Sequence, residues 1–437
     1  MNKTIQTVMS HTRFSYVWIV VGVTFLVLLA AAGIRATPSV MILPLEHEFG
    51  WTRTTISFVI SVNIALYGLI GPFSAAAMQR YGIRPIVLGA LVLLVVGTSV
   101  STFMTMPWHM VLAWGILVGA GSGVAANTLA ATIVSRWFET RRGLAMGLLT
   151  ASSATGQMVF LPLMAYMVEH LGWRSVAILV ASVAALAIPL VAIFLPERPQ
   201  DIGLKSYGQL EDVPPESTVK SKNPLALAFD ALGKAVKIRD FWLLFFSFFI
   251  CGMSTNGYIG SHFIAMCGDY GISAVGGASM LATMGMLDLF GTTMSGWLSD
   301  RFNARVLLFW YYSLRGVALI FLPHAFGLSY FGLPIFAIFY GLDWIATVPP
   351  TVRLANDVFG RLAAPIVFGW IVAGHQLGAA SATMLAGTLR NSVGSYTLSS
   401  MLMGAACIIA AVMVLRIKGH RVGGELIAAV AAPAMNR

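Results

Sequence analysis

The chain contains twelve long runs of apolar residues, and this repetition limits the possible folds more than any other feature. A helix needs about 20 predominantly apolar residues to cross the hydrocarbon core of a bilayer. Backbone polar groups in that core are satisfied only inside helices or closed barrels, and runs of this length favour helices. We therefore expect an all-α membrane protein with twelve spans, near residues 14–45, 53–78, 84–103, 107–135, 141–168, 174–195, 240–265, 274–299, 305–323, 328–352, 361–388 and 393–416.

Composition supports a membrane protein and excludes several other classes. Of the 437 residues, 58% are apolar and only 10% are charged, whereas a soluble domain carries about 25% charged residues. The net charge of +10 is not accompanied by a basic patch with aromatic residues, so we expect no nucleic-acid partner. Cys251, Cys267 and Cys407 are too few and too scattered for a disulfide framework or a metal site. We expect no metal and no cofactor.

The distribution of lysine and arginine predicts the orientation. With both chain ends in the cytoplasm, 22 of the 27 Lys and Arg residues fall inside, and three (Arg53, Arg174 and Arg390) fall outside. The other two, Arg35 and Arg315, fall within apolar runs. Positive charge in short loops stays on the cytoplasmic side during insertion. We expect a multi-pass protein of the inner (plasma) membrane with cytoplasmic N- and C-termini.

The chain divides into two similar halves. Residues 196–239 form the only long hydrophilic linker, between predicted six-helix bundles at residues 1–195 and 240–416, and residues 417–437 form a cytoplasmic tail. Shifting the first half by 221 residues places residues 79–84 on residues 300–305, and other features coincide at the same offset. We therefore expect two pseudo-symmetric bundles with a substrate path between them near the midplane, and a monomeric protein.

Three segments carry a resemblance to a known family. Residues 296–305 resemble the inner loop G-x-L-x-D-R-x-G-x-R of the major facilitator superfamily, and the earlier copy has Gln79 in place of the acid. Residues 136–147 and 196–204 resemble the start of helix five and the end of helix six in the bacterial monocarboxylate-porter-like group. The resemblance covers essentially the whole chain and implies the major facilitator fold. It also implies an inner gate or latch made by Arg80, Arg84, Asp300, Arg301 and Arg305.

Two departures from known patterns accompany this resemblance. The fifth span lacks the G-x-x-x-G-P-x-x-G-G pattern of drug–proton antiporters. The eighth span carries Asp288, whereas several members of the monocarboxylate group carry an arginine there.

Three ionisable residues of the second half lie at a similar depth in the predicted bilayer. Asp288, Arg315 and Asp343 each lie 10 to 12 residues from a charged residue at the inner end of their spans. At about 1.5 Å per residue, this is roughly 15–18 Å deep. Asp288 and Arg315 are on neighbouring spans and are able to meet. We predict that protonation of Asp288 or Asp343 releases Arg315 and couples proton binding to transport, with a static ion pair as the alternative.

A second set of polar residues is predicted to bind the substrate. The Arg35 guanidinium suits a carboxylate, which it grips through two parallel hydrogen bonds, although it also has Glu46 and Glu48 within reach as a snorkelling side chain. His375 is suited to binding an anion or relaying a proton, with a satisfied core histidine as the alternative. The predicted binding residues are Arg35, Asn127, Asn256, Tyr258 and His375. We interpret His262 as a gate or a satisfied polar residue, and Asn63, Tyr67 and Gln157 as groups that join helices.

These observations predict a secondary active transporter that works by alternating access. The expected cargo is a small organic anion, a mono- or dicarboxylate, carried with protons. Efflux of drugs or amphiphiles is the first alternative, and it requires a large apolar cavity and tolerance of Arg35→Ala. A non-transporting membrane sensor is the second, but the longest hydrophilic stretch is a linker rather than a folded domain. We expect no enzyme, because neither a His-Glu-x-x-His zinc site nor a Gly-x-Ser-x-Gly turn is present.

Overall fold

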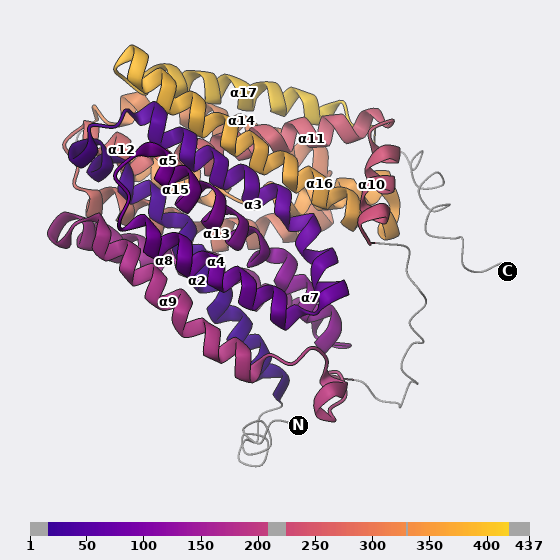
Figure 1. Cartoon of the computed structure of the whole chain (residues 1–437). Helices are drawn as coiled ribbons and strands as arrows, with labels where there is room; N and C mark the ends of the chain where they lie inside the picture. Colours follow the sequence, from indigo (N-terminus) through magenta and orange to yellow (C-terminus); the bar gives the residue numbers. More distant parts are fainter. Residues whose placement is uncertain (1–15, 209–223, 329–330, 419–437) are drawn as a thin grey trace.

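The computed structural model describes residues 16–208, 224–328 and 331–418, and in these residues the chain is helical (Figure 1). Twelve helices in the described part are long and apolar enough to cross a membrane, as the sequence predicts. Within the same residues, extended pairing is limited to one isolated bridge between Phe138 and Tyr207. The all-α membrane fold is therefore confirmed.

The first half contains six spans, and the fourth is not continuous. The predicted fourth span is confirmed as Pro107–Trp137, but it is assembled from four consecutive segments, α5, η1, α6 and α7. The break falls at Ala125 and Ala126, directly after a glycine-rich turn with low helix propensity. The elements of this half are α2 (Tyr16–Phe49), α3 (Arg53–Tyr81), α4 (Ile83–Ser101), α5 (Pro107–Met110), η1 (Val111–Val118), α6 (Gly119–Val124), α7 (Asn127–Trp137), α8 (Arg142–Leu171) and α9 (Trp173–Phe194).

The second half also contains six spans, and two of them are irregular near the middle of the protein. The predicted linker holds two short helices, η2 (Pro199–Ile202) and α10 (Pro224–Ala235), while the residue boundaries of the two halves remain predictions. The spans of this half are built from α11 (Arg239–Gly252), η3 (Met253–Ile259), α12 (Gly260–Asp269), α13 (Ala274–Arg301), α14 (Ala304–Ala325), α15 (Gly332–Asp343), α16 (Val348–Val393) and α17 (Thr397–Leu415).

Each irregularity has a local cause. The seventh span widens into the π-helix η3 between α11 and α12. The tenth span stops at Asp343 and resumes at Val348, immediately before Pro349 and Pro350, which are favoured in the first turn of a helix. Gly360 has a φ of 75°, which other residues rarely adopt, and it separates the tenth span from the eleventh within α16. The tenth span is thus interrupted directly before the proline pair.

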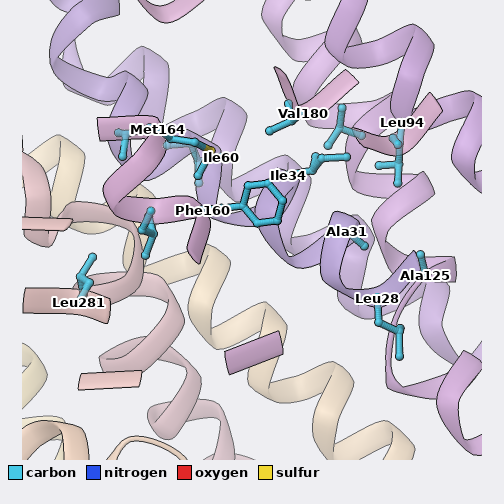
Figure 2. Packing of buried hydrophobic residues seen from close by; sticks show 14 of the residues in the cluster. Leu28, Ala31, Ile34, Ile60, Leu94, Ala125, Phe160, Met164, Val180 and Leu281 are labelled. Carbon is cyan, nitrogen blue, oxygen red and sulfur yellow. The ribbon is translucent and has the colours of Figure 1, made fainter. Parts of the chain in front are cut away.

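The first half packs around α2, which is buried along most of its length. Figure 2 shows Phe160 of α8 beside Ile34 of α2 in this apolar core. A Cβ atom at Gly33 would lie 2.7 Å from the Phe160 ring, so glycine is required for this close approach. Small residues at such crossings are a common device in membranes, where van der Waals packing rather than water exclusion joins helices.

The two halves meet along α3 and α16. Ser61 of α3 donates a hydrogen bond to the carbonyl oxygen of Ala380 in α16 at 2.7 Å. Nearer the end opposite the linker, a Cβ atom at Gly387 would overlap the Ser57 side chain. Helix α8 packs against α13 on another side of the same interface, where the Glu169 carboxylate accepts a hydrogen bond from Val275 N at 3.2 Å. The halves are therefore tightly joined at the end opposite the linker.

Candidate functional site

A cavity of about 90 Å³ lies between the two halves. Because about 10–15 Å³ of such space accommodates one water molecule, the cavity has room for several. Elements of both halves contribute to it: α2, α3 and α8 from the first, and η3, α12, α13, α16 and the end of α15 from the second. Its polar lining residues are Arg35, Ser39, Asn63, Tyr67, Gln157, Asn256, Ser261 and Gln376, and its larger apolar ones are Ile60, Ile64, Leu161, Leu281 and Trp344.

Arg35 is the only formally charged side chain among the described residues that line this cavity. Its Nη1 donates a hydrogen bond to the Tyr67 hydroxyl at 2.8 Å, and its guanidinium carbon lies 4.8 Å from the centre of the Tyr67 ring. Glu46 and Glu48 instead pair with arginines of α3 and α9, so Arg35 does not snorkel toward them. The guanidinium is therefore oriented by one aromatic side chain and keeps donors for an anion, since arginine carries five N–H groups.

His375 and Tyr258 are not among the residues that line the cavity. Neighbouring residues in a helix point about 100° apart, so Gln376 faces the cavity while His375 lies 4.7 Å from Phe248 of α11, measured between ring centres. Tyr258 is fully buried and bonds to Ser400 of α17 at 2.5 Å. Neither side chain therefore lines the cavity in this structure.

Two other predicted binding residues have different outcomes. Asn256, in the π-helix η3, lines the cavity. The side chain of Asn127 lies outside those that the structure describes, so its predicted role stays a prediction.

Tyr67, Gln157 and Asn63 line the cavity although the sequence suggested only helix-joining roles. Asn63 does both, since its Nδ2 also donates to the carbonyl oxygen of Trp114 at 2.5 Å. Gln376 also lines the cavity and was not among the predicted binding residues. All of these residues stand out in the sequence as polar residues within apolar spans. Which of them face the cavity depends on the rotation of each helix.

A buried ion pair joins α14 to the end of α15. Arg315 Nε lies 2.7 Å from Asp343 Oδ2, and the Arg315 side chain is fully buried. Its Nη2 donates to the carbonyl oxygens of Asp343 and Trp344, where α15 ends. Its Nη1 lies 2.9 Å from Cys251 Sγ. A cation at the C-terminal end of a helix also interacts favourably with the helix dipole.

Asp288 does not pair with Arg315, so that predicted contact is corrected. Its Oδ1 accepts hydrogen bonds from Thr292 and from the backbone amide of Ile345, both at 2.8 Å. Ile345 lies in the interruption of the tenth span. Asp288 and Arg315 therefore both hold this interruption, and Trp344 between their contacts lines the cavity.

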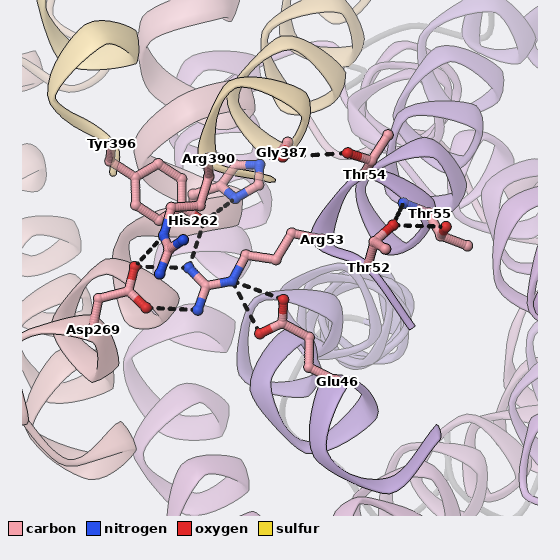
Figure 3. Close-up of polar contacts among 10 residues, drawn as sticks. All are labelled: Glu46, Thr52, Arg53, Thr54, Thr55, His262, Asp269, Gly387, Arg390 and Tyr396. Carbon is pink, nitrogen blue, oxygen red and sulfur yellow. Dashed lines mark hydrogen bonds and ion pairs between the residues drawn. The ribbon is translucent and has the colours of Figure 1, made fainter. Parts of the chain in front are cut away.

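A network of charged residues closes the end of the protein opposite the linker (Figure 3). Arg53 of α3 lies 2.6 and 2.8 Å from the two carboxylate oxygens of Asp269 in α12, across the interface. The same guanidinium bonds to Glu46 of its own half at 2.9 Å, and Asp269 also accepts from Arg390 at 2.8 Å. Arg53 is only 6% exposed, so water screens these interactions little.

Tyr396 and His262 of the second half also belong to this network. The Tyr396 hydroxyl accepts a hydrogen bond from Arg53 at 3.2 Å and lies 2.9 Å from His262 Nδ1, while His262 Nε2 lies 3.0 Å from the carbonyl oxygen of Thr383. Burial raises the pKa of Tyr396 to about 12, so its hydroxyl stays protonated and is able to donate to Nδ1. His262 is therefore a satisfied polar residue beside the Arg53 network.

In the described part of the chain, the arginines of the predicted inner latch make interactions within their own half. Arg84 donates to the carbonyl oxygen of Ala192, and Arg305 donates to that of Ile417 at 2.9 Å. The remaining arginines of the set lie over neighbouring rings, Arg80 at 5.3 Å from Tyr81 and Arg301 at 4.0 Å from Trp297, and Asp300 is exposed.

Glu197 supplies the carboxylate that Gln79 does not. It accepts hydrogen bonds from the backbone amides of Ile83 and Arg84 at 2.5 and 2.9 Å, at the N-terminus of α4. It also pairs with Arg136 at 3.5 Å. The end of the first half nearest the linker is thus held by an acid that follows the sixth span.

Comparisons with known proteins agree with this architecture. The family model of the Major Facilitator Superfamily matches residues 23–380. An uncharacterized MFS-type transporter of Bacillus subtilis is 26% identical over 90% of this chain and 92% of its own length. Monocarboxylate transporter 13 of Bos taurus is 27% identical over 89% of this chain and 86% of its own length. The crystal structure of a D-xylose-proton symporter superposes with a TM-score of 0.74 at 16% identity, covering 93% of this chain and all of that one.

Proposed function

The chain belongs to the Major Facilitator Superfamily of membrane transporters, and on that premise we propose that it is a proton-coupled carrier of a small organic anion that works by alternating access. The observation that carries this proposal is the position of Arg35. It is a lone cation at the interface of the two halves, in a cavity whose described lining residues include no acid. Anions are attracted to such a site, and an ionisable residue inside a membrane marks a functional position by default.

The composition of the lining favours a monocarboxylate over a dicarboxylate. One guanidinium neutralises one carboxylate through two parallel hydrogen bonds, and a second carboxylate would be left unpaired at a high cost. Gln157, Asn256 and Gln376 offer neutral donors and acceptors for hydroxyl or keto groups, and Leu161 and Trp344 suit a short apolar part. Relatives that are named monocarboxylate transporters support this choice.

The buried ion pair is our candidate for proton coupling. Protonation of Asp343 would remove the negative charge that faces Arg315 and leave the guanidinium on backbone carbonyls and Cys251. Trp344 follows Asp343 directly and lines the cavity, so a change at the ion pair reaches the binding site through one residue. Asp288, which accepts the backbone amide of Ile345, would hold the interruption of the tenth span while Asp343 is protonated. A purely structural ion pair is the competing interpretation.

We propose that this carrier is located in the inner (plasma) membrane, with both termini in the cytoplasm. The lysine and arginine bias of the loops supports this orientation. The network around Arg53 then lies on the outer side, so the described state is closed to the outside. We further propose that the carrier works as a monomer, since both halves of the site come from one chain.

Uptake into proteoliposomes tests the substrate proposal. A thermal-shift screen of the purified protein with short mono- and dicarboxylic acids identifies a ligand, and uptake of that ligand is measured with and without an inward proton gradient. We expect Arg35→Ala to abolish binding and uptake and Arg35→Lys to retain part of both, because lysine keeps the charge without the fork geometry. His375→Gln, next to the cavity but outside its lining, is the matched control. Full activity of Arg35→Ala would instead support efflux of amphiphiles.

Exchange measurements test the coupling proposal separately. In Asp343→Asn, we expect exchange of labelled for unlabelled substrate to continue while accumulation driven by a proton gradient is lost. A merely structural ion pair predicts that both activities fall together with protein stability. Retention of gradient-driven accumulation would exclude Asp343 as the coupling residue.

A further inference from the structure

A basic cavity of about 660 Å³ lies at the linker end of the second half, well apart from the central cavity. Arg239 begins α11, Arg305 lies in the first turn of α14, and Arg416 and Lys418 follow α17. Three helix ends therefore bring four cations to one place, together with Leu415 and Ile417. No acidic side chain is among the described residues that line it.

The charges of this cavity are poorly neutralised by the protein. Within the described ranges, no ion pair joins Arg239, Arg416 or Lys418 to an acid. Asp240, the neighbour of Arg239, is buried, and its carboxylate accepts the backbone amide of Lys418 at 3.1 Å. Arg305 donates to the carbonyl oxygen of Ile417 at 2.9 Å, which fixes its guanidinium in the wall of the cavity. Four clustered cations facing one buried acid leave an excess of positive charge.

The internal repeat shows what is missing here. At the offset of 221, Arg84 corresponds to Arg305 and Glu197 corresponds to Lys418. In the first half, Glu197 places its carboxylate on the N-terminus of α4 and beside Arg136. In the second half, the corresponding residue is a lysine, and a cavity is present instead. The first half thus carries an anion at this position, whereas the second half carries a cation there.

An apolar groove of about 310 Å³ adjoins the basic cavity and shares Arg416 with it. Its other lining residues are Ile408, Ile409, Val412 and Met413, all on α17. Ile409 is 59% exposed and Val412 is 46% exposed, on the lipid-facing side of the last span. From residue 408 to 416 the chain advances about 12 Å along the axis of α17, at 1.5 Å per residue. An acyl chain lying in this groove would have its polar end beside Arg416.

We propose that the basic cavity and the groove together form a binding site for an anionic phospholipid. The phosphate lies among Arg239, Arg305, Arg416 and Lys418, and one acyl chain lies along the groove of α17. Basic pockets between transmembrane helices at this level of the bilayer are suited to anionic headgroups. The groove selects a lipid over a free phosphate, because only a lipid fills both parts. An anion here supplies the second half with the counterpart of the Glu197 carboxylate, so it is expected to stabilise that half.

Native mass spectrometry and thermal unfolding of the full chain in detergent test this site. The probes are dioleoyl phosphatidylglycerol, its zwitterionic counterpart dioleoyl phosphatidylcholine, and glycerol 1-phosphate, which is a headgroup without chains. We expect phosphatidylglycerol to bind and stabilise more than either of the others. Equal binding of the two lipids, or equal stabilisation by glycerol 1-phosphate at the same concentration, would overturn the proposal.

Variants separate the two parts of the site. Each basic residue near the membrane surface contributes about fivefold to anionic lipid binding, so Arg416→Gln with Lys418→Gln is expected to weaken phosphatidylglycerol binding about 25-fold. The matched control replaces Arg301 and Arg353 by Gln, since both are exposed at the same end of the same half but outside the cavity. Val412→Trp fills the groove, leaves every charge in place, and is expected to weaken lipid binding as well. The site is contradicted if the control variant loses as much phosphatidylglycerol binding as the site variants. It is also contradicted if neither site variant loses any binding.

Discussion

Arg53 is the residue whose replacement most directly tests the closure at the end opposite the linker. Its guanidinium makes two hydrogen bonds to Asp269 and one to Tyr396, all across the interface between the halves. It also bonds to Glu46 within its own half, and Asp269 keeps a second partner in Arg390. Replacement by alanine removes every bond that Arg53 makes across the interface but leaves Asp269 with one cation.

The magnitude follows from this geometry. Removing one partner of a buried ion pair costs about 3–5 kcal/mol. Because Arg390 continues to neutralise Asp269, we expect the lower part of that range or less, about 2–3 kcal/mol of the free energy that favours the closed state. At 1.4 kcal/mol for each factor of ten, the closed state loses about 30- to 140-fold in population relative to a state that is open at this end.

Distance measurements between spin labels detect this shift. Cysteines placed at Met106 and Asn391, exposed residues of opposite halves at the end opposite the linker, carry the labels in a background without Cys251, Cys267 and Cys407. We expect Arg53→Ala to add a longer-distance population that the parent protein lacks.

The control is a second outer ion pair that does not cross the interface. Arg174 pairs with Glu48 at 2.6 Å, and both residues belong to the first half. Arg174→Ala should leave the distance distribution unchanged. If Arg53→Ala also leaves it unchanged in a folded protein, the network does not hold the closed state and the reasoning above is refuted.

Three further replacements test other parts of the structure by thermal unfolding. Arg315→Met leaves the Asp343 carboxylate buried without its cation and should cost about 3–5 kcal/mol, and Asp343→Asn in the same chain should restore much of that loss. Glu197→Gln removes the charge at the N-terminus of α4 and should cost about 1 kcal/mol, while Arg198→Gln should cost almost nothing. Gly257→Leu should prevent folding, since a Cβ atom there meets the backbone of Ala379, whereas Gly22→Leu has open space and should be tolerated.

The architecture was predictable because lipid imposes one rule on the whole chain. Apolar runs of spanning length must be helical, so the twelve spans and the two-half fold followed from the sequence and were confirmed. The same rule identified Arg35, Arg315, Asp288 and Asp343 as exceptional, because charge inside a membrane requires a specific environment. Pro349 and Pro350 also indicate the interruption of the tenth span, because proline has no backbone N–H to continue the hydrogen bonds of a helix.

The direction in which each polar side chain points was not predictable in the same way. His375 and Gln376 are equally polar neighbours, yet only Gln376 lines the cavity. Asp288 and Asp343 were both candidate partners for Arg315, and the structure places Asp343 on it while Asp288 bonds to Ile345. The closure through Arg53 and Asp269 joins residues 216 positions apart, and no local pattern indicates such a pair.

The sequence by itself determined the class of the protein, its number of spans, its internal repeat and the few polar residues that a bilayer tolerates only for a reason. The tertiary structure decided which of those residues meet: Arg35 with Tyr67 at the cavity, Arg315 with Asp343, and Arg53 with Asp269. The physical reason is that hydropathy is a local property of the sequence, whereas side-chain pairing is not. Hydropathy acts on each segment separately, whereas side-chain pairing depends on the rotation and crossing of helices, which only the packing of the whole chain fixes.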